Sequence, residues 1–277
     1  MSSILLGILP WVHIRFAVLE MPLFFAFLYR IYVKTKRSNY KYYIYYLIPV
    51  TILFIVFEIY NYTVWDTLNP AASEVNAGGK TFAVLPFQGL LGAFFDQEYG
   101  ILLNFPMFIF LLTGIVLTLK KKLAGYSVLM LILSIPYLLL FTTFRLWSGG
   151  WCPPARFILV LLPLYSFYIA YALQLMNNVL SKLVFGLVTL YGFAYSLLSL
   201  KPVLVGFNSG TGRNHALAQI HRLLFNRHLT DYLPSVFSPQ YWGLFVVWMG
   251  ICVGVTLVLL ISMKQNLFGP RGYVRRQ

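Results

Sequence analysis

Long apolar stretches, each about the length of a membrane-spanning helix, constrain the fold of this chain more than any other feature. A bilayer core about 30 Å thick requires roughly 20 apolar residues per helix. Because these runs are continuous rather than alternating, and a helix satisfies its own backbone in lipid, helices are favoured over a barrel. The sequence predicts an all-α, polytopic transmembrane bundle of about seven spans, at residues 11–33, 42–61, 101–119, 123–144, 156–176, 183–205 and 241–263.

The composition agrees with lipid as the solvent. Of the 277 residues, 60% are hydrophobic and only 10% are charged. A water-soluble domain of this size could not cover such a core with polar surface. We therefore expect residues 1–277 to form a single transmembrane domain, with outer loops at 61–100, 145–156 and 206–240.

The net charge of +14 is concentrated in particular segments, which argues against a nucleic-acid partner. Four segments carry basic residues and no acid: Arg30, Lys34, Lys36, Arg37 and Lys41; Lys120, Lys121 and Lys122; Lys182; and Lys264, Arg271, Arg275 and Arg276. The segments that alternate with them hold six of the seven acids: Glu58, Asp66, Glu74, Asp96, Glu98 and Asp231. Because basic loops stay in the cytoplasm, a multi-pass protein of the inner (plasma) membrane is predicted, with its N-terminus outside and its C-terminus inside.

The N-terminal region contains polar residues inside apolar sequence. Residues 3–10 are too short to span and are predicted to be the tail of a preceding or re-entrant segment. On the next helix, His13 and Glu20 would share one face, with Glu20 about 13 Å from the helix start, where lipid demands a partner or a proton. Two interpretations stay open: a structural intramembrane network of His13, Arg15 and Glu20, or an outer site in which His13 and Arg15 bind an anionic headgroup.

The first outer loop ends in a short apolar segment followed by two acids. Residues 86–95 are too few to cross, so we expect them to lie along the membrane interface. Asp96 and Glu98 follow and are expected to face water. Paired carboxylates suggest a general acid or base, but residues two apart on a helix do not face the same way. They are therefore weak catalytic candidates, and the alternative is that they only end a helix.

The second outer loop reads FRLWSGGWCPPARF, and its glycines and prolines impose a tight, non-helical path. Trp147 and Trp151 are expected at the level of the lipid headgroups. Arg145 and Arg156 flank the turn, where two arginines beside aromatic rings suit a phosphate and a sugar ring. The alternative is that both arginines extend to lipid phosphates in general.

The third outer loop contains a basic amphipathic helix, predicted to lie on the outer surface. Its apolar stripe is Leu217, Ile220, Leu223 and Leu224, and its polar side is Arg213, His215, His221, Arg222, Arg227 and His228. Two of these histidines share a face but are about 10 Å apart along it, too far to bind one metal ion. We predict no metal site here and no cofactor, and leave a divalent cation open.

Three segments resemble a known family: LPWVHIRF, PFQGLLGAFFDQEYGILLNFP and WSGGWCPPARFILVLLPL. They are similar to the C-terminal half of bacterial GT-C membrane glycosyltransferases, the dolichyl- or polyprenyl-phosphate sugar transferases. The resemblance covers roughly residues 5–175 and implies sugar transfer from a polyprenyl-phosphate donor on the extracytoplasmic face. The positions that would bind the lipid phosphate are His13, Arg15, Lys80, Arg145 and Arg156.

The resemblance also implies a missing group. The family's catalytic carboxylate normally lies in a first outer loop near the N-terminus, and nothing before Trp11 here supplies it. The N-terminus also lacks the pattern of a signal peptide, although it is predicted to lie outside. The chain is therefore expected to be the C-terminal part of a larger protein, or to require a partner subunit.

Two other functions stay open beside a glycosyltransferase. One is a transporter or flippase subunit for a lipid-linked or amphiphilic substrate, which would also use intramembrane polar residues. The other is a non-catalytic membrane partner. Transporters commonly contain repeated halves, and no repeat is evident here. No phosphate-binding loop, nucleophile elbow or dinucleotide fingerprint is present in the sequence.

Overall fold

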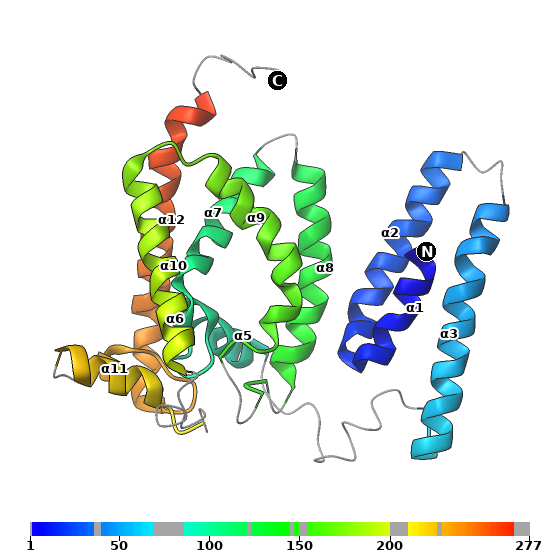
Figure 1. The fold of residues 1–277 in the computed structure, drawn as a ribbon, viewed down its shortest axis with the longest axis horizontal. Helices are drawn as coiled ribbons and strands as arrows, with labels where there is room; N and C mark the ends of the chain where they lie inside the picture. The colour runs from blue at the N-terminus through cyan, green and yellow to red at the C-terminus, as the bar shows by residue number, and fades with distance from the viewer. Residues whose placement is uncertain are drawn as a thin grey trace. The chain divides into compact units, whose positions relative to one another are not determined.

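Helices form all the elements that could be placed in the chain (Figure 1). The computed structural model describes residues 2–35, 40–68, 86–120, 123–144, 147–149, 154–199, 210–225 and 229–268. Four helices in these ranges are long and apolar enough to cross a membrane: α3 (Lys41–Trp65), α8 (Ala124–Thr143), α10 (Val179–Ser199) and α12 (Trp242–Phe268). The predicted class, a helical membrane protein, is confirmed, whereas seven spans are not.

The four long helices expose apolar side chains over much of their length. On α12, Val246 and Ile261 expose 69% and 68% of their surface. Exposure of apolar area to water costs roughly 25 cal/mol per Å². Such helices are stable only where lipid replaces water, which is the environment predicted from the composition.

The remaining predicted spans are interrupted or short. The predicted span 101–119 consists of α6 (Ile101–Asn104), the 3₁₀ turn η2 (Pro106–Phe108) and α7 (Ile109–Leu119). Pro106 lacks a backbone donor, so it favours the first turn of a new helix over the interior of a continuous one. The predicted span 156–176 consists of η3 (Ile158–Leu161) and α9 (Leu162–Gln174).

The N-terminal region differs from its prediction in where the helices begin and end. Helix α1 (Ser2–Val12) is separate, the turn η1 (Ile14–Phe16) follows, and α2 (Ala17–Thr35) begins after it. His13 lies between helices, so it does not share a helical face with Glu20, and the predicted arrangement is wrong. Glu20 lies instead in the first turn of α2, where the positive end of the helix dipole favours an acid.

The contacts divide the chain into two compact units. Unit 1 comprises residues 1–85 and 130–145, and unit 2 comprises residues 86–129 and 146–277. Each unit is described by itself below.

In unit 1, α1 packs against α2 and α3. Gly7 permits the close approach, because a Cβ at this position would lie 2.9 Å from Leu53 Cβ. Leu6, Tyr46 and Val50 form a buried apolar cluster between these helices. This packing stabilises an 11-residue helix that could not persist alone.

In unit 2, α7 and α9 form the closest helix pair. A Cβ on Gly114 would lie 2.1 Å from the Tyr168 backbone oxygen, so only glycine permits this separation. The Thr118 hydroxyl donates to Ser127 Oγ (2.9 Å), and the Tyr168 hydroxyl donates to the Ser127 backbone oxygen (2.6 Å). Small residues and hydrogen bonds between helices are the interactions that hold helices together in lipid.

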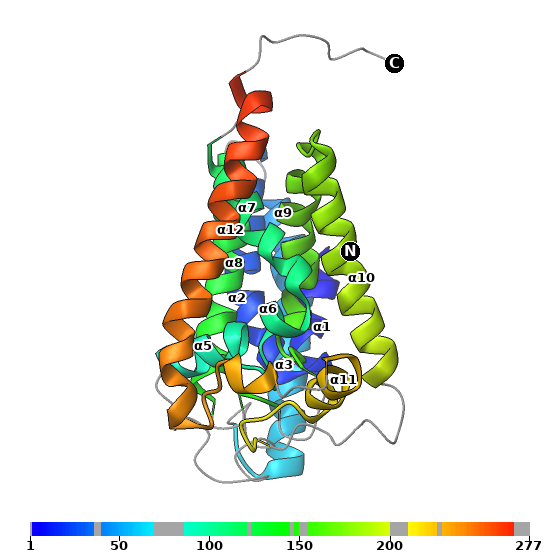
Figure 2. The same ribbon diagram turned by 90° about the vertical axis from the view of Figure 1, so that its left-hand side faces the viewer.

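The two ends of unit 2 differ in content (Figures 1 and 2). Helices α5 (Pro86–Phe95), α6 and α11 (His215–Phe225) lie at one end. The α7–α8 and α9–α10 connections lie at the other, where Lys120 follows α7 and Lys182 lies in the first turn of α10. The described parts of the predicted outer loops of this unit therefore share one end, opposite two predicted cytoplasmic segments.

Candidate functional site

Three consecutive polar residues directly after α5 are completely buried. Asp96, Gln97 and Glu98 each expose 0% of their surface. The expectation that Asp96 and Glu98 face water is therefore wrong. The segments 210–214 and 233–237, both from the third predicted outer loop, hydrogen-bond to this turn and help to bury it.

Asp96 accepts three backbone hydrogen bonds. Its Oδ1 accepts from the N–H groups of Glu98 (2.8 Å) and Tyr99 (3.1 Å), and its Oδ2 accepts from the N–H of Val236 (2.8 Å). Burial raises the pKa of Asp96 to about 7, although these donors act to lower it. The carboxyl group thus joins the end of α5 to a loop 140 residues later in the chain.

Glu98 contacts the segment that precedes α11. Its Oε2 accepts from the Gly212 N–H at 2.8 Å, and its Oε1 lies 3.5 Å from the Thr211 hydroxyl. Gly212 has φ +84°, and a Cβ there would lie 2.6 Å from Ser238 Oγ, so glycine is required for two reasons. The Thr211 hydroxyl in turn lies 3.4 Å from Nε2 of the exposed His215.

A buried amide network connects three elements of unit 2. Asn214 Nδ2 lies within hydrogen-bond distance of the Gln97 backbone oxygen (2.7 Å), Asn104 Oδ1 (2.9 Å) and the Tyr195 hydroxyl (3.0 Å). Asn214 Oδ1 accepts from the Leu217 N–H at 2.9 Å and so caps the N-terminus of α11. One asparagine therefore fixes the position of α11 relative to α6 and α10.

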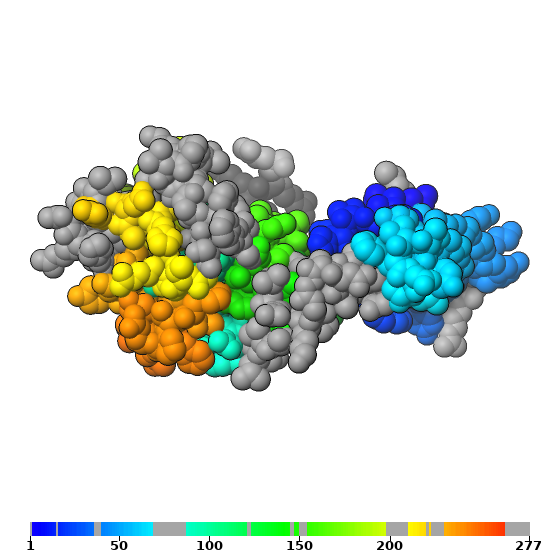
Figure 3. Space-filling view, turned by 90° about the horizontal axis from the view of Figure 1, so that it is seen from below, coloured from blue at the N-terminus to red at the C-terminus, as the bar shows by residue number. Residues whose placement is uncertain are grey.

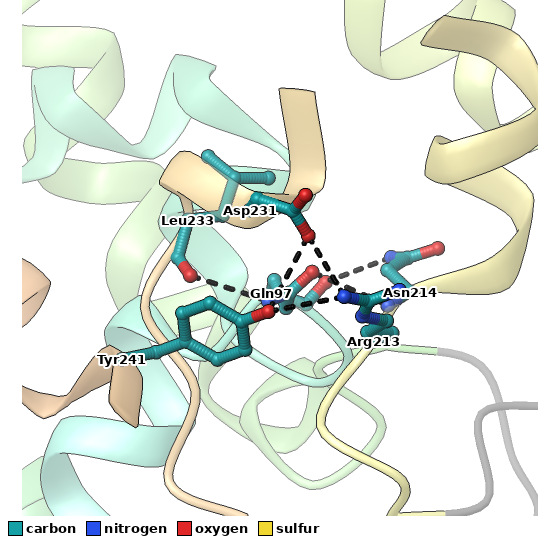
Figure 4. A network of polar contacts seen from close by, with 6 residues as sticks. All are labelled: Gln97, Arg213, Asn214, Asp231, Leu233 and Tyr241. Carbon is teal, nitrogen blue, oxygen red and sulfur yellow. Dashed lines mark hydrogen bonds and ion pairs between the residues drawn. The ribbon is translucent and has the colours of Figure 1, made fainter. Parts of the chain in front are cut away.

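A second set of polar contacts, around Arg213 and Asp231, lies next to this network (Figure 4). Gln97 Nε2 donates to the Leu233 backbone oxygen at 3.2 Å. Arg213 Nη2 lies 3.0 Å from Asp231 Oδ1, and the Tyr241 hydroxyl lies 3.3 Å from both groups. Both charged side chains are about half exposed, so solvent screens the ion pair and its contribution to stability is small.

The second predicted outer loop joins the same assembly through Trp147. This side chain is 5% exposed, stacks on Phe237 with centroids 5.7 Å apart, and contacts Tyr99 edge to face at 6.0 Å. A Cβ on Gly92 would lie 2.2 Å from its ring. Trp147 therefore has aromatic neighbours from the protein itself, its depth relative to the lipid headgroups stays a prediction, and Trp151 lies outside the described residues. The Ala155 N–H also donates to the Tyr99 backbone oxygen at 2.9 Å.

Two apolar residues at the start of α11 pack on protein. Ala216 and Leu217 belong to a buried cluster with Tyr195 and Leu233, whereas Arg222 and His215 are exposed. The predicted amphipathic helix is confirmed, and its beginning is fixed by tertiary contacts. In the space-filling view, α11 (yellow) adjoins the start of α12 (orange) (Figure 3).

The structure describes the side chains of only some of the residues predicted to bind a phosphate. Arg156 is exposed, with its guanidinium carbon 5.8 Å from the Phe157 ring centroid. His13 is exposed in unit 1. Lys80, Arg145 and the side chain of Arg15 lie outside the described residues. Their proposed roles therefore stay predictions.

The residues that organise the site were not identified from the sequence. Gln97, Asn104, Asn214 and Tyr195 are all central to the buried network. Two signals were present: Asn104 interrupts an apolar run, and Asn214 stands directly before an amphipathic segment, the position of a helix cap. Neither signal indicates that the two side chains meet.

We call the assembly of Asp96–Gly100 with segments 147–149, 154–157, 210–217 and 230–241 the loop platform. In it, the two carboxylates bind backbone N–H groups and have no solvent-exposed surface, so this conformation gives them a structural role. The exposed groups at this end include His215 and Arg156. Comparison of the chain with family models, curated proteins and solved structures finds no match.

Proposed function

We propose that the chain belongs to an integral membrane glycosyltransferase and supplies the part that binds a polyprenyl-phosphate sugar donor. The supporting observation is the loop platform. The described parts of two segments that resemble GT-C transferases meet there, residues 86–100 with residues 147–149 and 154–157, through the Tyr99–Ala155 hydrogen bond and the packing of Tyr99 against Trp147. Residues that bind a substrate commonly lie on loops that a scaffold of regular elements holds in position.

In this proposal the shorter helices α2, α7 and α9 also cross the membrane, with the loop platform on the extracytoplasmic side of the plasma membrane. The charge pattern supports that orientation, because Lys120 and Lys182 lie at the opposite end. A polyprenyl phosphate would then meet the loop platform at the boundary between lipid and water.

Arg156 is the described residue best suited to bind the donor phosphate. Its guanidinium is exposed and lies close to an aromatic ring, and charge-assisted bonds to phosphate are strong where water is scarce. His13, Arg15, Lys80 and Arg145 are further ligands in this proposal. A preceding segment or a partner subunit would supply the catalytic carboxylate, because Asp96 and Glu98 are buried.

A sugar-transfer assay on native membranes tests this proposal. Membranes that contain the natural full-length protein would be given a radiolabelled polyprenyl-phosphate sugar, and transfer would be compared between wild type and Arg156→Gln. We expect a loss of about tenfold or more, the effect of one charge-assisted phosphate contact of about 1.5–3 kcal/mol. Arg222→Gln, an exposed arginine on α11, is the matched control and should transfer normally.

One result would reject the proposed function, and another would reject the role of Arg156 in it. The first is that wild-type membranes neither transfer the sugar nor bind a polyprenyl phosphate more tightly than membranes that lack the protein. The second is that Arg156→Gln and Arg222→Gln are equally active at equal protein levels, which would exclude Arg156 as a donor ligand.

A transporter or flippase is the second candidate, and the broken helices favour it. The chain is interrupted at His13 between α1 and α2, and at Phe105 between α6 and α7. Interrupted helices commonly surround the substrate sites of transporters. Proteoliposomes that contain the pure chain and no sugar acceptor would test this candidate. Movement of a fluorescent polyprenyl phosphate from one leaflet of their membrane to the other would favour it.

A further inference from the structure

A pocket of about 580 Å³ lies in unit 1, at the C-terminal end of α2, which carries the first residues of the first basic segment. Its lining comes from α1, α2 and α3 and includes Phe27, Arg30, Ile31, Lys34, Tyr42 and Tyr46. The pocket is separate from the loop platform, which belongs to unit 2. It therefore does not depend on the function proposed above.

The rim of the pocket is basic. Arg30 and Lys34 are four residues apart on α2, so they lie on one face of the helix, and both are exposed. Among the described residues that line the pocket there is no acid. Lys41, at the start of α3, adds positive charge to the same segment. Two adjacent cations without an acid attract an anion, and the arginine fork matches the oxygens of a phosphate.

The floor of the pocket is apolar and already packed. Tyr46 is 6% exposed, and its hydroxyl donates to the Phe24 backbone oxygen at 3.3 Å. Phe27 and Ile31 pack against the same buried cluster as Tyr46. A ligand that fills the pocket would therefore contact cations at one side and aromatic or aliphatic carbon at the other.

This combination distinguishes between sources of phosphate. Phe27 and Ile31 are only half-buried, so a free phosphate ion would satisfy Arg30 and Lys34 but would leave the exposed parts of these two side chains uncovered. The headgroup of a phospholipid, with its glycerol and upper acyl carbons, satisfies both parts of the pocket. Basic pockets between helices near the cytoplasmic surface are typical sites for anionic lipid headgroups, and the charge pattern predicts the cytoplasmic side for this end of α2.

We propose that the pocket between α1, α2 and α3 binds the phosphodiester headgroup of an anionic phospholipid, with Arg30 and Lys34 at the phosphate and Phe27 and Ile31 against the glycerol and acyl carbons. Tyr42, exposed at the rim, is available to donate a hydrogen bond to the headgroup. The site stabilises the packing of unit 1 when it is occupied, because a ligand that binds only the folded state shifts the equilibrium toward it.

Native mass spectrometry of the full chain in detergent tests this site. The chain would be titrated with phosphatidylglycerol, phosphatidylcholine and inorganic phosphate. We expect tight binding of phosphatidylglycerol only, and about tenfold weaker binding after Arg30→Gln with Lys34→Gln. The matched control is Lys120→Gln with Lys182→Gln, which removes two exposed charges from unit 2 and should bind like wild type.

A second variant blocks the pocket without a change of charge. Thr35 also lines the pocket, and its hydroxyl donates to the Ile31 backbone oxygen of its own helix at 2.8 Å. Thr35→Trp should fill the space and weaken phosphatidylglycerol binding while helix content and elution volume are unchanged. This variant keeps the test decisive if the double charge variant does not fold.

Several outcomes would overturn the proposal. Equal loss in the Lys120 and Lys182 control would show that the lipid binds by general surface charge. Equal binding of phosphatidylcholine would show that the net negative charge is not recognised. Binding of inorganic phosphate as tight as that of phosphatidylglycerol would show an ion site without a lipid component. Unchanged binding in a folded Thr35→Trp variant would place the lipid elsewhere.

Discussion

At the scale of single residues, the chemistry of the loop platform is that of buried polar groups with specific partners. Asp96 and Asn214 illustrate the two kinds. Asp96 holds two loops through backbone N–H groups, and Asn214 connects a helix cap to an amide network. Such groups stabilise the fold only while their partners are present, because an unsatisfied buried polar group costs about 1–3 kcal/mol.

The first prediction concerns Asp96 and pH. Its pKa in the folded state, about 7, is above the ordinary aspartate value of 3.8, so the folded protein favours the protonated form. The stabilisation from this group is therefore complete below about pH 4 and is lost as the pH rises toward 7. Thermal unfolding of wild type and Asp96→Asn in detergent, from pH 4 to pH 8, should show a wild-type advantage that shrinks over this range.

The Asp96→Asn variant also loses some stability at every pH, because it loses a hydrogen bond. The amide nitrogen of Asp96→Asn would replace an oxygen that accepts an N–H, so one backbone donor, such as that of Val236, would lose its partner. A melting temperature difference between wild type and variant that is the same at every pH would contradict the titration of Asp96. A difference that grows with pH would contradict the raised pKa.

The second prediction concerns Asn214. Asn214→Ala removes the cap of α11 and leaves buried partners unsatisfied, so we expect a loss of roughly 2–4 kcal/mol in the free energy of unfolding. Asn178 is a matched control, because its Oδ1 accepts from the Leu180 N–H at 2.9 Å on an exposed helix start. Asn178→Ala should cost about 1 kcal/mol or less. Equal effects on denaturant unfolding would show that the amide network contributes nothing beyond the cap.

At the scale of secondary-structure elements, close helix contacts depend on small residues. Helices α7 and α9 approach at Gly114, and α1 approaches α3 at Gly7. Short helices such as α1 and α7 are not stable alone, so these contacts determine whether they form. On both sides of the interruption at His13 the helices have such contacts, because α1 packs against α2 and α3, and α2 also packs against α3.

The third prediction concerns this helix contact. Gly114→Ala places a Cβ 2.1 Å from the Tyr168 backbone oxygen, so α7 and α9 must separate, and we expect a loss of about 1–3 kcal/mol. Gly125 on α8 is the control, because a Cβ there meets nothing within 4 Å. Gly125→Ala should be neutral or slightly stabilising, since alanine favours helix. Melting temperatures in one detergent compare the two, and equal shifts would contradict the close approach.

At the scale of the whole molecule, the alternation of charged segments predicts which ends face the cytoplasm. In unit 2 the loop platform is at one end and the connections that contain Lys120 and Lys182 are at the other. The orientation can be measured without knowledge of the substrate.

The fourth prediction concerns this orientation. In a variant without the two natural cysteines, Gln240→Cys would label the end with the loop platform and Asn177→Cys the opposite end; both positions are exposed. A membrane-impermeant maleimide added to intact cells should react with Gln240→Cys, and with Asn177→Cys only after the cells are permeabilised. The reverse pattern would show that the predicted orientation of unit 2 is wrong.

The properties that the sequence determines by itself depend on local composition and length. Continuous apolar runs predicted the four long helices, and the polar pattern around Leu217 predicted the amphipathic helix α11, because neighbouring residues decide both. The acids at 96 and 98 are different. Their sequence neighbourhood predicted exposure to water, yet both are buried by chain that is more than 110 residues away.

Only the tertiary structure decided how the polar residues meet. Asp96 reaches Val236 across 140 residues, Gln97 reaches Asn214 across 117, and Trp147 stacks on Phe237. No periodicity in a single sequence contains these pairs, because they depend on which helix ends come together in space. The apolar segments thus determine that the chain is helical and lies in lipid, whereas long-range hydrogen bonds and ring contacts determine that the described loop segments of unit 2 meet in one assembly.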